Sequence, residues 1–168
     1  MDKPSVYLDT TIISAYWYAG SDLASFARRL KTREWWELER PHFAVWTSNV
    51  SELELRTGTF RRQAECVRMV QRIRYLPTTG VVSELADEIL AAGVVPENKP
   101  RDALQMALSA AHETDYLLSW NYAHLVNPVA QARLDSICQD RSLKSPLLVS
   151  PETIPKTSLG QNIRRRQP

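Results

Sequence analysis

Four polar side chains that are far apart in the sequence could act together on one chemical group. Asp9 directly follows one apolar segment and Asn121 follows another, while Glu54 and Asp102 lie in the first two turns of segments with helical spacing. If the apolar segments are parallel strands, all four side chains come to the edge of the sheet where the strands end. Carboxylates gathered there repel one another unless a cation neutralises them. Because the donors are hard oxygens, the sequence favours Mg²⁺ or Mn²⁺ as that cation.

Each of these residues also has a purely structural explanation that the sequence leaves open. Asp9 could cap the following helix, and Asp102 could interact with a helix dipole from the first turn. Glu54 could be an exposed helix residue, and Glu52 competes for any role given to it. Asn121 could be a turn residue after a strand. Taken one at a time the structural explanations are favoured, whereas their joint position favours a shared site.

Short apolar segments alternate with segments of helical spacing, and this pattern predicts the elements that would position the site. Strands separated by helices predict a parallel sheet covered on both faces, in a three-layer α/β/α domain over residues 1–155. The predicted strands are 5–8, 42–48, 75–79, 115–120 and 146–150, and the predicted helices are 10–20, 22–40, 49–58, 59–75, 81–93, 100–113 and 127–140.

Local signals predict several helix boundaries and one apolar helix face. Ser48 is expected to cap the helix over 49–58, and Gly58 to end it. Ser83 is expected to cap the helix over 81–93. In the helix over 22–40, four apolar residues fall roughly on one face at helical spacing. They are Leu23, Phe26, Leu30 and Trp35.

Four sequence blocks resemble the PIN domain family in their order and spacing over nearly the whole chain. They are VYLDTTIISAY, SELELRTG, RDALQMALSAA and DYLLSWNYAHLVN, and PLLVSPETI closes the pattern. The resemblance implies a PIN-like three-layer sandwich with a central, mainly parallel sheet. It also implies an Mg²⁺- or Mn²⁺-dependent endoribonuclease, similar to the VapC-like toxins of bacterial type II toxin–antitoxin pairs, with RNA as substrate and an antitoxin protein as partner.

The resemblance also assigns expected roles to the four polar residues. The family's first acid falls on Asp9, its glutamate best on Glu54, and its third acid on Asp102. Asp9 and Asp102 are therefore expected to hold the metal, and Glu54 to hold a water and assist proton transfer. Many family members have aspartate where this chain has Asn121, which keeps a carbonyl oxygen but loses a charge. Asp115 is expected at the other end of the same strand and cannot replace it.

Basic and aromatic residues suggest how RNA and a protein partner could bind. Arginines are concentrated in residues 56–74, and those predicted to hold phosphates beside the acidic edge are Arg56, Arg61 and Arg62. A solvated helix face is the alternative explanation. Tyr16, Trp17 and Tyr18 could stack on bases or serve packing. An aromatic patch near Trp17, or around Trp35 and Trp36, is expected to support a homodimer or to bind a partner peptide.

Composition sets limits on the class of protein. The 168 residues, 43% of them hydrophobic, are enough for one packed domain. The formal net charge is +2. Residues 156–168 contain four basic residues and no acidic ones, and this tail is expected to be disordered. No apolar stretch is long enough to span a membrane, no signal peptide is recognised, and two distant cysteines suit a reducing cytoplasm.

Two other functional classes remain open on the sequence alone. A PIN-fold nucleic-acid-binding protein with a degraded metal site is favoured by Asn121. An aspartyl-nucleophile phosphatase is suggested by LDTT after a strand, but such enzymes generally need a second acid where this chain has Thr11. His42, His112 and His124 are scattered without zinc-ligand spacing, and of these His124 is expected to lie near the acidic edge.

Overall fold

The computed structural model describes residues 3–156 and contains a five-stranded sheet in which every neighbouring pair of strands is parallel. The spatial order is β3-β2-β1-β4-β5, so the first strand lies at the centre. The strands are β1 (Ser5–Leu8), β2 (Ala44–Thr47), β3 (Arg74–Tyr75), β4 (Tyr116–Leu118) and β5 (Leu147–Val149). The prediction of a parallel α/β sheet is confirmed.

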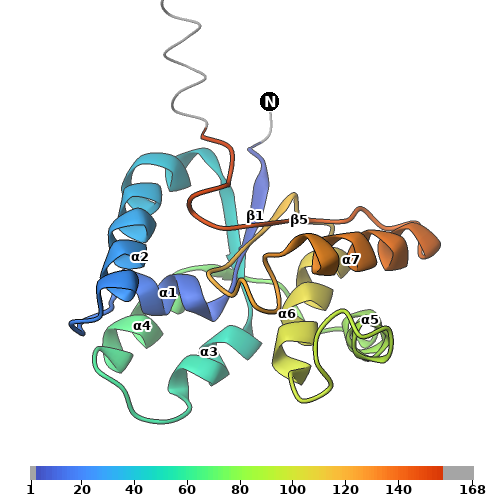
Figure 1. Cartoon of the computed structure of the whole chain (residues 1–168), viewed down its shortest axis with the longest axis horizontal. Coiled ribbons are helices and arrows are strands. Elements are labelled where there is room, and N and C mark those ends of the chain that lie inside the picture. Colours follow the sequence, from blue (N-terminus) through green and yellow to red (C-terminus); the bar gives the residue numbers. More distant parts are fainter. Residues whose placement is uncertain (1–2, 157–168) are drawn as a thin grey trace, which may run out of the picture.

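Helices cover both faces of this sheet (Figure 1). On one side lie α1, α2 and α4, and on the other lie α5, α6 and α7, with α3 near the edge where the strands end. The helices are α1 (Thr10–Tyr16), α2 (Leu23–Glu34), α3 (Asn49–Arg56), α4 (Gln63–Val70), α5 (Gly80–Ala91), α6 (Pro100–Ala111) and α7 (Pro128–Asp140). This arrangement is the expected three-layer α/β/α sandwich.

The central strand packs against both helical layers because its side chains alternate between the two faces of the sheet. Val6 and Leu8 belong to the core beneath α1 and α4, whereas Tyr7 belongs to the core beneath α5 and α6. All three residues are fully buried. A strand buried on both faces is expected in a parallel sheet, and it explains why residues 5–8 read as a continuous apolar segment.

The register of the two central strands sets the position of the polar residues that follow them. Leu8 of β1 is paired with Leu118 of β4, so these strands end level with each other. The backbone N–H of Asp9 then donates to the carbonyl of Leu118 at 3.1 Å. The residue after each strand is therefore brought to the same edge of the sheet, Asp9 from β1 and Ser119 from β4.

The long helix predicted over residues 22–40 is divided, and its apolar face differs from the expected one. After α2 the chain forms a π-helical turn (Trp35–Glu39) and a 3-10 turn (Arg40–His42). Trp35 is 2% exposed, whereas Leu23 and Leu30 are 83% and 53% exposed. The wider π-helical turn changes the direction of the side chains, so the tryptophan enters the core while the leucines of α2 face solvent.

The single helix predicted over residues 59–75 is also wrong at both ends. Gly58 has a φ of +79°, which glycine adopts without strain, and it follows the end of α3 as expected. Arg62 has a φ of 66° and precedes α4, which delays the start of that helix. Residues Arg74–Tyr75 form strand β3 where the helix was predicted to end.

Two capping predictions have different outcomes. Ser48 accepts a 3.2 Å hydrogen bond from the N–H of Ser51 and caps α3, as expected. Ser83 does not cap α5, because that helix begins earlier, at Gly80, and the Thr79 side chain accepts from the N–H of Val82. The predicted strand over 75–79 includes Thr79, whereas in the structure this residue is the N-cap of α5.

Within residues 3–156, no helix is long and apolar enough to cross a membrane. Both Cys66 and Cys138 are buried, as expected. The predicted basic tail lies outside the described residues, apart from Lys156, whose ammonium group is 3.3 Å from a carboxylate oxygen of Glu34.

Candidate functional site

Asp9 lies at the position before the first turn of α1, but its side chain does not cap that helix. Its carboxylate instead accepts hydrogen bonds from three hydroxyl groups. Thr10 Oγ1 donates to Oδ1 at 3.0 Å, while Thr11 Oγ1 and Ser119 Oγ donate to Oδ2 at 2.7 and 2.5 Å. The capping explanation of Asp9 is therefore wrong, because its oxygens are turned toward the hydroxyls rather than the helix N–H groups.

Burial makes the negative charge of Asp9 costly. The residue is 4% exposed, and this desolvation raises the pKa of its carboxyl group above the usual value. The bonds from Ser119, Thr11 and Thr10 oppose that shift, and the nearby charge of Asp102 adds to it. A cation near Asp9 would favour the charged form, so the environment is suited to positive charge.

Glu54 lies on α3 and is the glutamate that faces this region. Burial raises the pKa of its carboxyl group, the charge of Asp9 raises it further, and Arg101 opposes the shift. Gln105 Nε2 donates a weak, 3.5 Å hydrogen bond to Glu54 Oε2. Glu52 lies elsewhere, because its carboxylate binds Arg56 and Tyr75, each at 2.7 Å.

Asp102 is in the first turn of α6, as predicted, and two residues from the loop after β4 contact it. Asn121 Nδ2 donates to Asp102 Oδ2 at 3.2 Å, and His124 Nδ1 lies 2.7 Å from the same oxygen. The side-chain oxygen of Asn121 accepts from the backbone N–H of His124 at 3.1 Å. The side-chain oxygen of Asn121, which could have served a ligand, thus accepts a hydrogen bond within a turn. Asn121 therefore acts as a turn residue and also lies beside Asp102.

These residues line an open pocket of about 580 Å³ at the edge where the strands end. Glu54 comes from α3, Asp102 from α6, and Asn121 and His124 from the loop after β4. Asp9 is not part of the pocket wall and is buried behind it. The remaining lining residues are Asn98, Lys99, Pro100 and Arg101.

Several residues of this region were not singled out in the sequence. Ser119 and Thr11 hold the Asp9 carboxylate, and Lys99 and Arg101 place positive charge in the pocket. A signal for Ser119 was present, since it is a small polar residue at the end of the apolar stretch 116–118. The sequence contained no such signal for Lys99 and Arg101. These two residues reach the acidic side chains only because the start of α6 packs beside the end of α3.

The three arginines predicted to bind RNA lie outside this pocket. Arg56 forms a 2.7 Å ion pair with Glu52, and Arg62 forms a 2.8 Å ion pair with Glu65. Arg61 is exposed in the connection between α3 and α4. None of the three lines the pocket that contains Lys99 and Arg101, and their role in RNA binding stays a prediction.

The donor chemistry suits a hard divalent cation, although the side chains do not form a ready cluster. Within residues 3–156, no three His, Cys, Asp or Glu side chains are arranged so that they could share one metal ion. Asp9, Glu54 and Asp102 nevertheless lie close enough that the charge of one raises the pKa of another. Carboxylate oxygens are the hard ligands that Mg²⁺ and Mn²⁺ prefer, and a cation would relieve the repulsion between them. The residues are therefore chemically suited to the expected cation.

The predicted aromatic residues separate into two regions. Tyr16, Trp17 and Trp36 line a pocket of about 420 Å³ that also contains Arg40 and Arg72. Tyr18 lines a different pocket, beside Glu54. Trp35 is in the core, so the expected patch around Trp35 and Trp36 is only partly at the surface.

Comparison with known proteins agrees with the fold. The family model for the PIN domain matches residues 6–121, which include the four predicted site residues. Among solved structures, the chain is similar to the crystal structure of VapC20 from Mycobacterium tuberculosis, a toxin that cleaves the sarcin–ricin loop. The TM-score is 0.51 and the sequence identity 22%, over 67% of this chain and 87% of that chain.

Among curated proteins, none matches the sequence significantly. The family model covers well over half of the 168 residues, and its span begins in the central strand and ends at Asn121. The chain therefore belongs to the PIN domain family.

Proposed function

We propose that the protein is an Mg²⁺- or Mn²⁺-dependent endoribonuclease that hydrolyses phosphodiester bonds of RNA. The observation that carries this proposal is the gathering of Asp9, Glu54 and Asp102 at the edge of a PIN domain sheet, beside two exposed cations, Lys99 and Arg101. Three carboxylates alone would repel a phosphate, so a cation is needed before RNA can approach them. Lys99 and Arg101 supply additional positive charge for the phosphates.

Each residue has a role that follows from its position. Asp9 and Asp102 would hold the divalent cation, which when bound stabilises charge on the attacked phosphate and lowers the pKa of a water. Glu54, with a raised pKa and a place on the pocket wall, is suited to accept a proton from the attacking water. Asn121 and His124 fix the direction of the Asp102 carboxylate.

We further propose that this nuclease is the toxin of a bacterial type II toxin–antitoxin pair and acts in the cytoplasm. The similarity to VapC20 supports this assignment, since that protein is a toxin that cleaves RNA of the sarcin–ricin loop. An antitoxin protein would then be the natural partner. Co-expression with the product of an adjacent open reading frame tests the pairing, with relief of growth inhibition as the expected result.

A homodimer is proposed through α2. Leu23, Phe26 and Leu30 are spaced by three and four residues and are 83%, 44% and 53% exposed, so they form one apolar stripe along α2. The helix α2 lies at the outer side of the molecule (Figure 1). A second copy would cover this stripe by packing its own α2 across it. The sequence suggested a dimer contact in the same segment, around Trp35 and Trp36. In the proposed dimer, the leucines of α2 make the contact in place of these tryptophans.

A second candidate function is RNA binding without cleavage. It is favoured by the contacts of Asp102, whose Oδ2 is already held by Asn121 and His124. If these contacts keep Asp102 from holding a cation, the site would bind a phosphate through Lys99 and Arg101 without hydrolysing it. The two candidates make the same prediction for RNA affinity and opposite predictions for turnover.

The deciding experiment is cleavage of a mixed pool of single-stranded RNA with Mn²⁺, Mg²⁺ or chelator. Wild-type protein should cleave only with the cation, and Asp9→Asn and Asp102→Asn should each lower the rate by at least about a hundredfold. Asp87→Asn, an exposed carboxylate on α5, makes the same chemical change away from the site and should leave the rate unchanged. RNA binding without metal-dependent cleavage would select the binding protein instead.

A further inference from the structure

A second pocket of about 360 Å³ adjoins the first, and Glu54 lines both. Its wall is formed mainly by α1, by Tyr18 in the segment after α1, by Ser25 and Arg28 of α2, and by Trp120. Polar and aromatic groups alternate on this wall. The lining residues are Thr10, Thr11, Ser14, Ala15, Tyr18, Ser25, Arg28, Glu54 and Trp120. Glu54 is the residue that the two pocket walls share, whereas Lys99 and Arg101 line only the other pocket.

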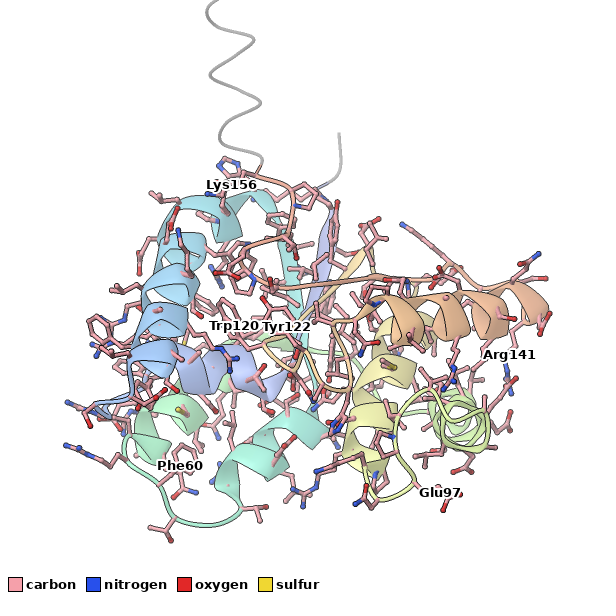
Figure 2. The ribbon with its side chains drawn as sticks, in the orientation of Figure 1. Phe60, Glu97, Trp120, Tyr122, Arg141 and Lys156 are labelled. Atoms are coloured by element: carbon pink, nitrogen blue, oxygen red, sulfur yellow. The ribbon has the colours of Figure 1, made fainter. Side chains whose placement is uncertain are left out.

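The flat side chains of this pocket are held in place by contacts within the protein. Trp120 is 5% exposed, and its indole N–H donates to Thr32 Oγ1 at 2.8 Å. The guanidinium carbon of Arg28 lies 5.6 Å from the centre of the Trp120 ring and 6.0 Å from that of Tyr122. Trp120 and Tyr122 lie beside each other, with ring centres 6.2 Å apart, near the middle of the view in Figure 2. A cation on an aromatic surface is suited to a nucleic-acid strand, because it can stack on a base and bind a phosphate.

Tyr18 is fixed on another part of the wall. Its hydroxyl accepts a 3.0 Å hydrogen bond from the backbone N–H of Asp22. The ring also lies against Gly20, where an added Cβ would be 2.3 Å from the Tyr18 hydroxyl oxygen. Glycine at this position is what allows the tyrosine to fold over the loop. The pocket is thus shaped before any ligand binds, which lowers the entropic cost of binding.

Hydroxyl groups supply the polar side of the pocket. Ser14 and Thr11 lie one turn apart on α1 and face the same space. Thr11 already donates to Asp9 and accepts from the N–H of Trp120 at 2.9 Å, so it connects the pocket wall to the buried carboxylate. Hydroxyls can both donate and accept, as the edges of nucleobases require. A ligand held here would sit next to the residue proposed to transfer a proton.

We propose that this pocket, bounded by Ser14, Tyr18, Arg28 and Trp120, binds the nucleotide next to the cleaved phosphodiester. The inference rests on the proposed ribonuclease function. The base enters the pocket and its phosphate meets Arg28, while the strand crosses Glu54 and continues to Lys99 and Arg101. Only an unpaired base can enter, so the protein acts on single-stranded or looped RNA.

The test uses two variants of the pocket and two matched controls in the full chain. Ser14→Leu fills the pocket, and Arg28→Gln removes its cation. Ser83→Leu, on the exposed surface of α5, is the control for Ser14→Leu. Arg29→Gln, beside Arg28 but outside the pocket wall, is the control for Arg28→Gln. Thermal melting of all five proteins establishes that each is folded.

Two quantities are measured. The first is the affinity for an unstructured oligonucleotide whose bridging 3′ oxygens are replaced by CH₂ groups, so that an attacking water cannot cleave it. The second is the base preference at the sites cut in single-stranded RNA. Ser14→Leu and Arg28→Gln should each weaken binding by about tenfold, which corresponds to one stacked base. Ser14→Leu should also change the base preference. The controls should stay within about twofold of wild type, a fraction of that stacking effect.

The outcomes separate this inference from the proposed function. If wild-type protein cleaves RNA but the pocket variants match it in affinity and base preference, the nucleotide pocket is refuted and the ribonuclease stands. If wild-type protein does not cleave but the pocket variants lose affinity, the pocket binds a nucleotide, whereas the ribonuclease and the position of the pocket beside a cleaved bond are both refuted. Absence of oligonucleotide binding by wild-type protein overturns the inference.

Discussion

The hydroxyl of Ser119 donates a 2.5 Å hydrogen bond to Oδ2 of Asp9 and joins the residues that follow the two central strands. The same hydroxyl oxygen accepts from the backbone N–H of Asn121 at 2.9 Å. Ser119 is therefore the connection between the buried carboxylate and the loop that carries Asn121 and His124. This connection makes the position of that loop depend on Asp9.

Replacing Ser119 with alanine should destabilise the fold and disturb the site together. The bond to a buried carboxylate and the acceptor for a partly buried N–H are both lost, so the free energy of unfolding should fall by about 2 kcal/mol. Urea denaturation measures this value, and the RNA cleavage rate should fall in parallel. Ser83→Ala, which removes an exposed hydroxyl on α5, is the matched control. Equal stability of Ser119→Ala and wild type would show that the bond to Asp9 contributes nothing.

Replacing Asn121 with aspartate should make the protein more dependent on a cation. The new side chain can still accept from the N–H of His124, but it no longer donates to Asp102 and places a second carboxylate beside it. We expect the melting temperature without metal to fall by about 2–4 °C, as for a loss of about 1 kcal/mol.

Mn²⁺ should remove this difference in the Asn121→Asp variant, because an added carboxylate ligand tightens cation binding. Melting curves with chelator and with a series of Mn²⁺ concentrations measure both effects. RNA cleavage should hold or rise in this variant, with Asp102→Asn as the inactive comparison. An apparent Mn²⁺ affinity no higher than that of wild type would place residue 121 outside any cation site.

Asp115 gives a pH-dependent contribution to stability at the opposite edge of the sheet. Burial alone would raise the pKa of its carboxyl group, but Lys144 and the N–H and hydroxyl of Ser5 outweigh burial and lower it. A lowered pKa in the folded state means that the contribution is present above the unfolded value, about 3.9, and is lost as the pH falls below it.

Asp115→Asn should therefore lower the free energy of unfolding by about 1 kcal/mol at pH 7, a modest value because the side chain is 33% exposed. At pH 3 the difference from wild type should be smaller. Urea denaturation at both pH values measures it, and Asp87→Asn on α5 corrects for a general loss of charge. A difference that grows toward low pH would contradict the sign of the shift.

The α2 stripe should control self-association. Leu23→Glu with Leu30→Glu adds charge to the proposed interface and should shift a dimer to monomer. Sedimentation over a range of protein concentrations measures the dissociation constant, which should rise by at least about a hundredfold, as expected when charges meet at an apolar contact. Val129→Glu, a 60% exposed apolar residue at the start of α7, is the control. A monomeric wild-type protein would remove α2 from consideration as an interface between copies.

The sequence by itself determined the alternation of strands and helices and the edge at which the acids meet. Periodicity is a local property, and a parallel sheet requires that residues following the strands reach the same edge. This is why Asp9 and Asp102 could be placed in advance, and why Asp115 was correctly assigned to the other end of β4. The end of α3, just before Gly58, was likewise readable, because a φ of +79° favours glycine.

Tertiary structure decided which side chains actually face one another. The choice between Glu52 and Glu54 depends on how α3 is rotated against α4, where Tyr75 and Gln71 take up Glu52. The exposure of Leu23 and Leu30 depends on a π-helical turn that no apolar spacing predicts. Lys99 and Arg101 enter the site only because the start of α6 lies beside α3. Sequence spacing orders residues along a helix or strand, whereas contacts between elements arise from packing across the whole fold.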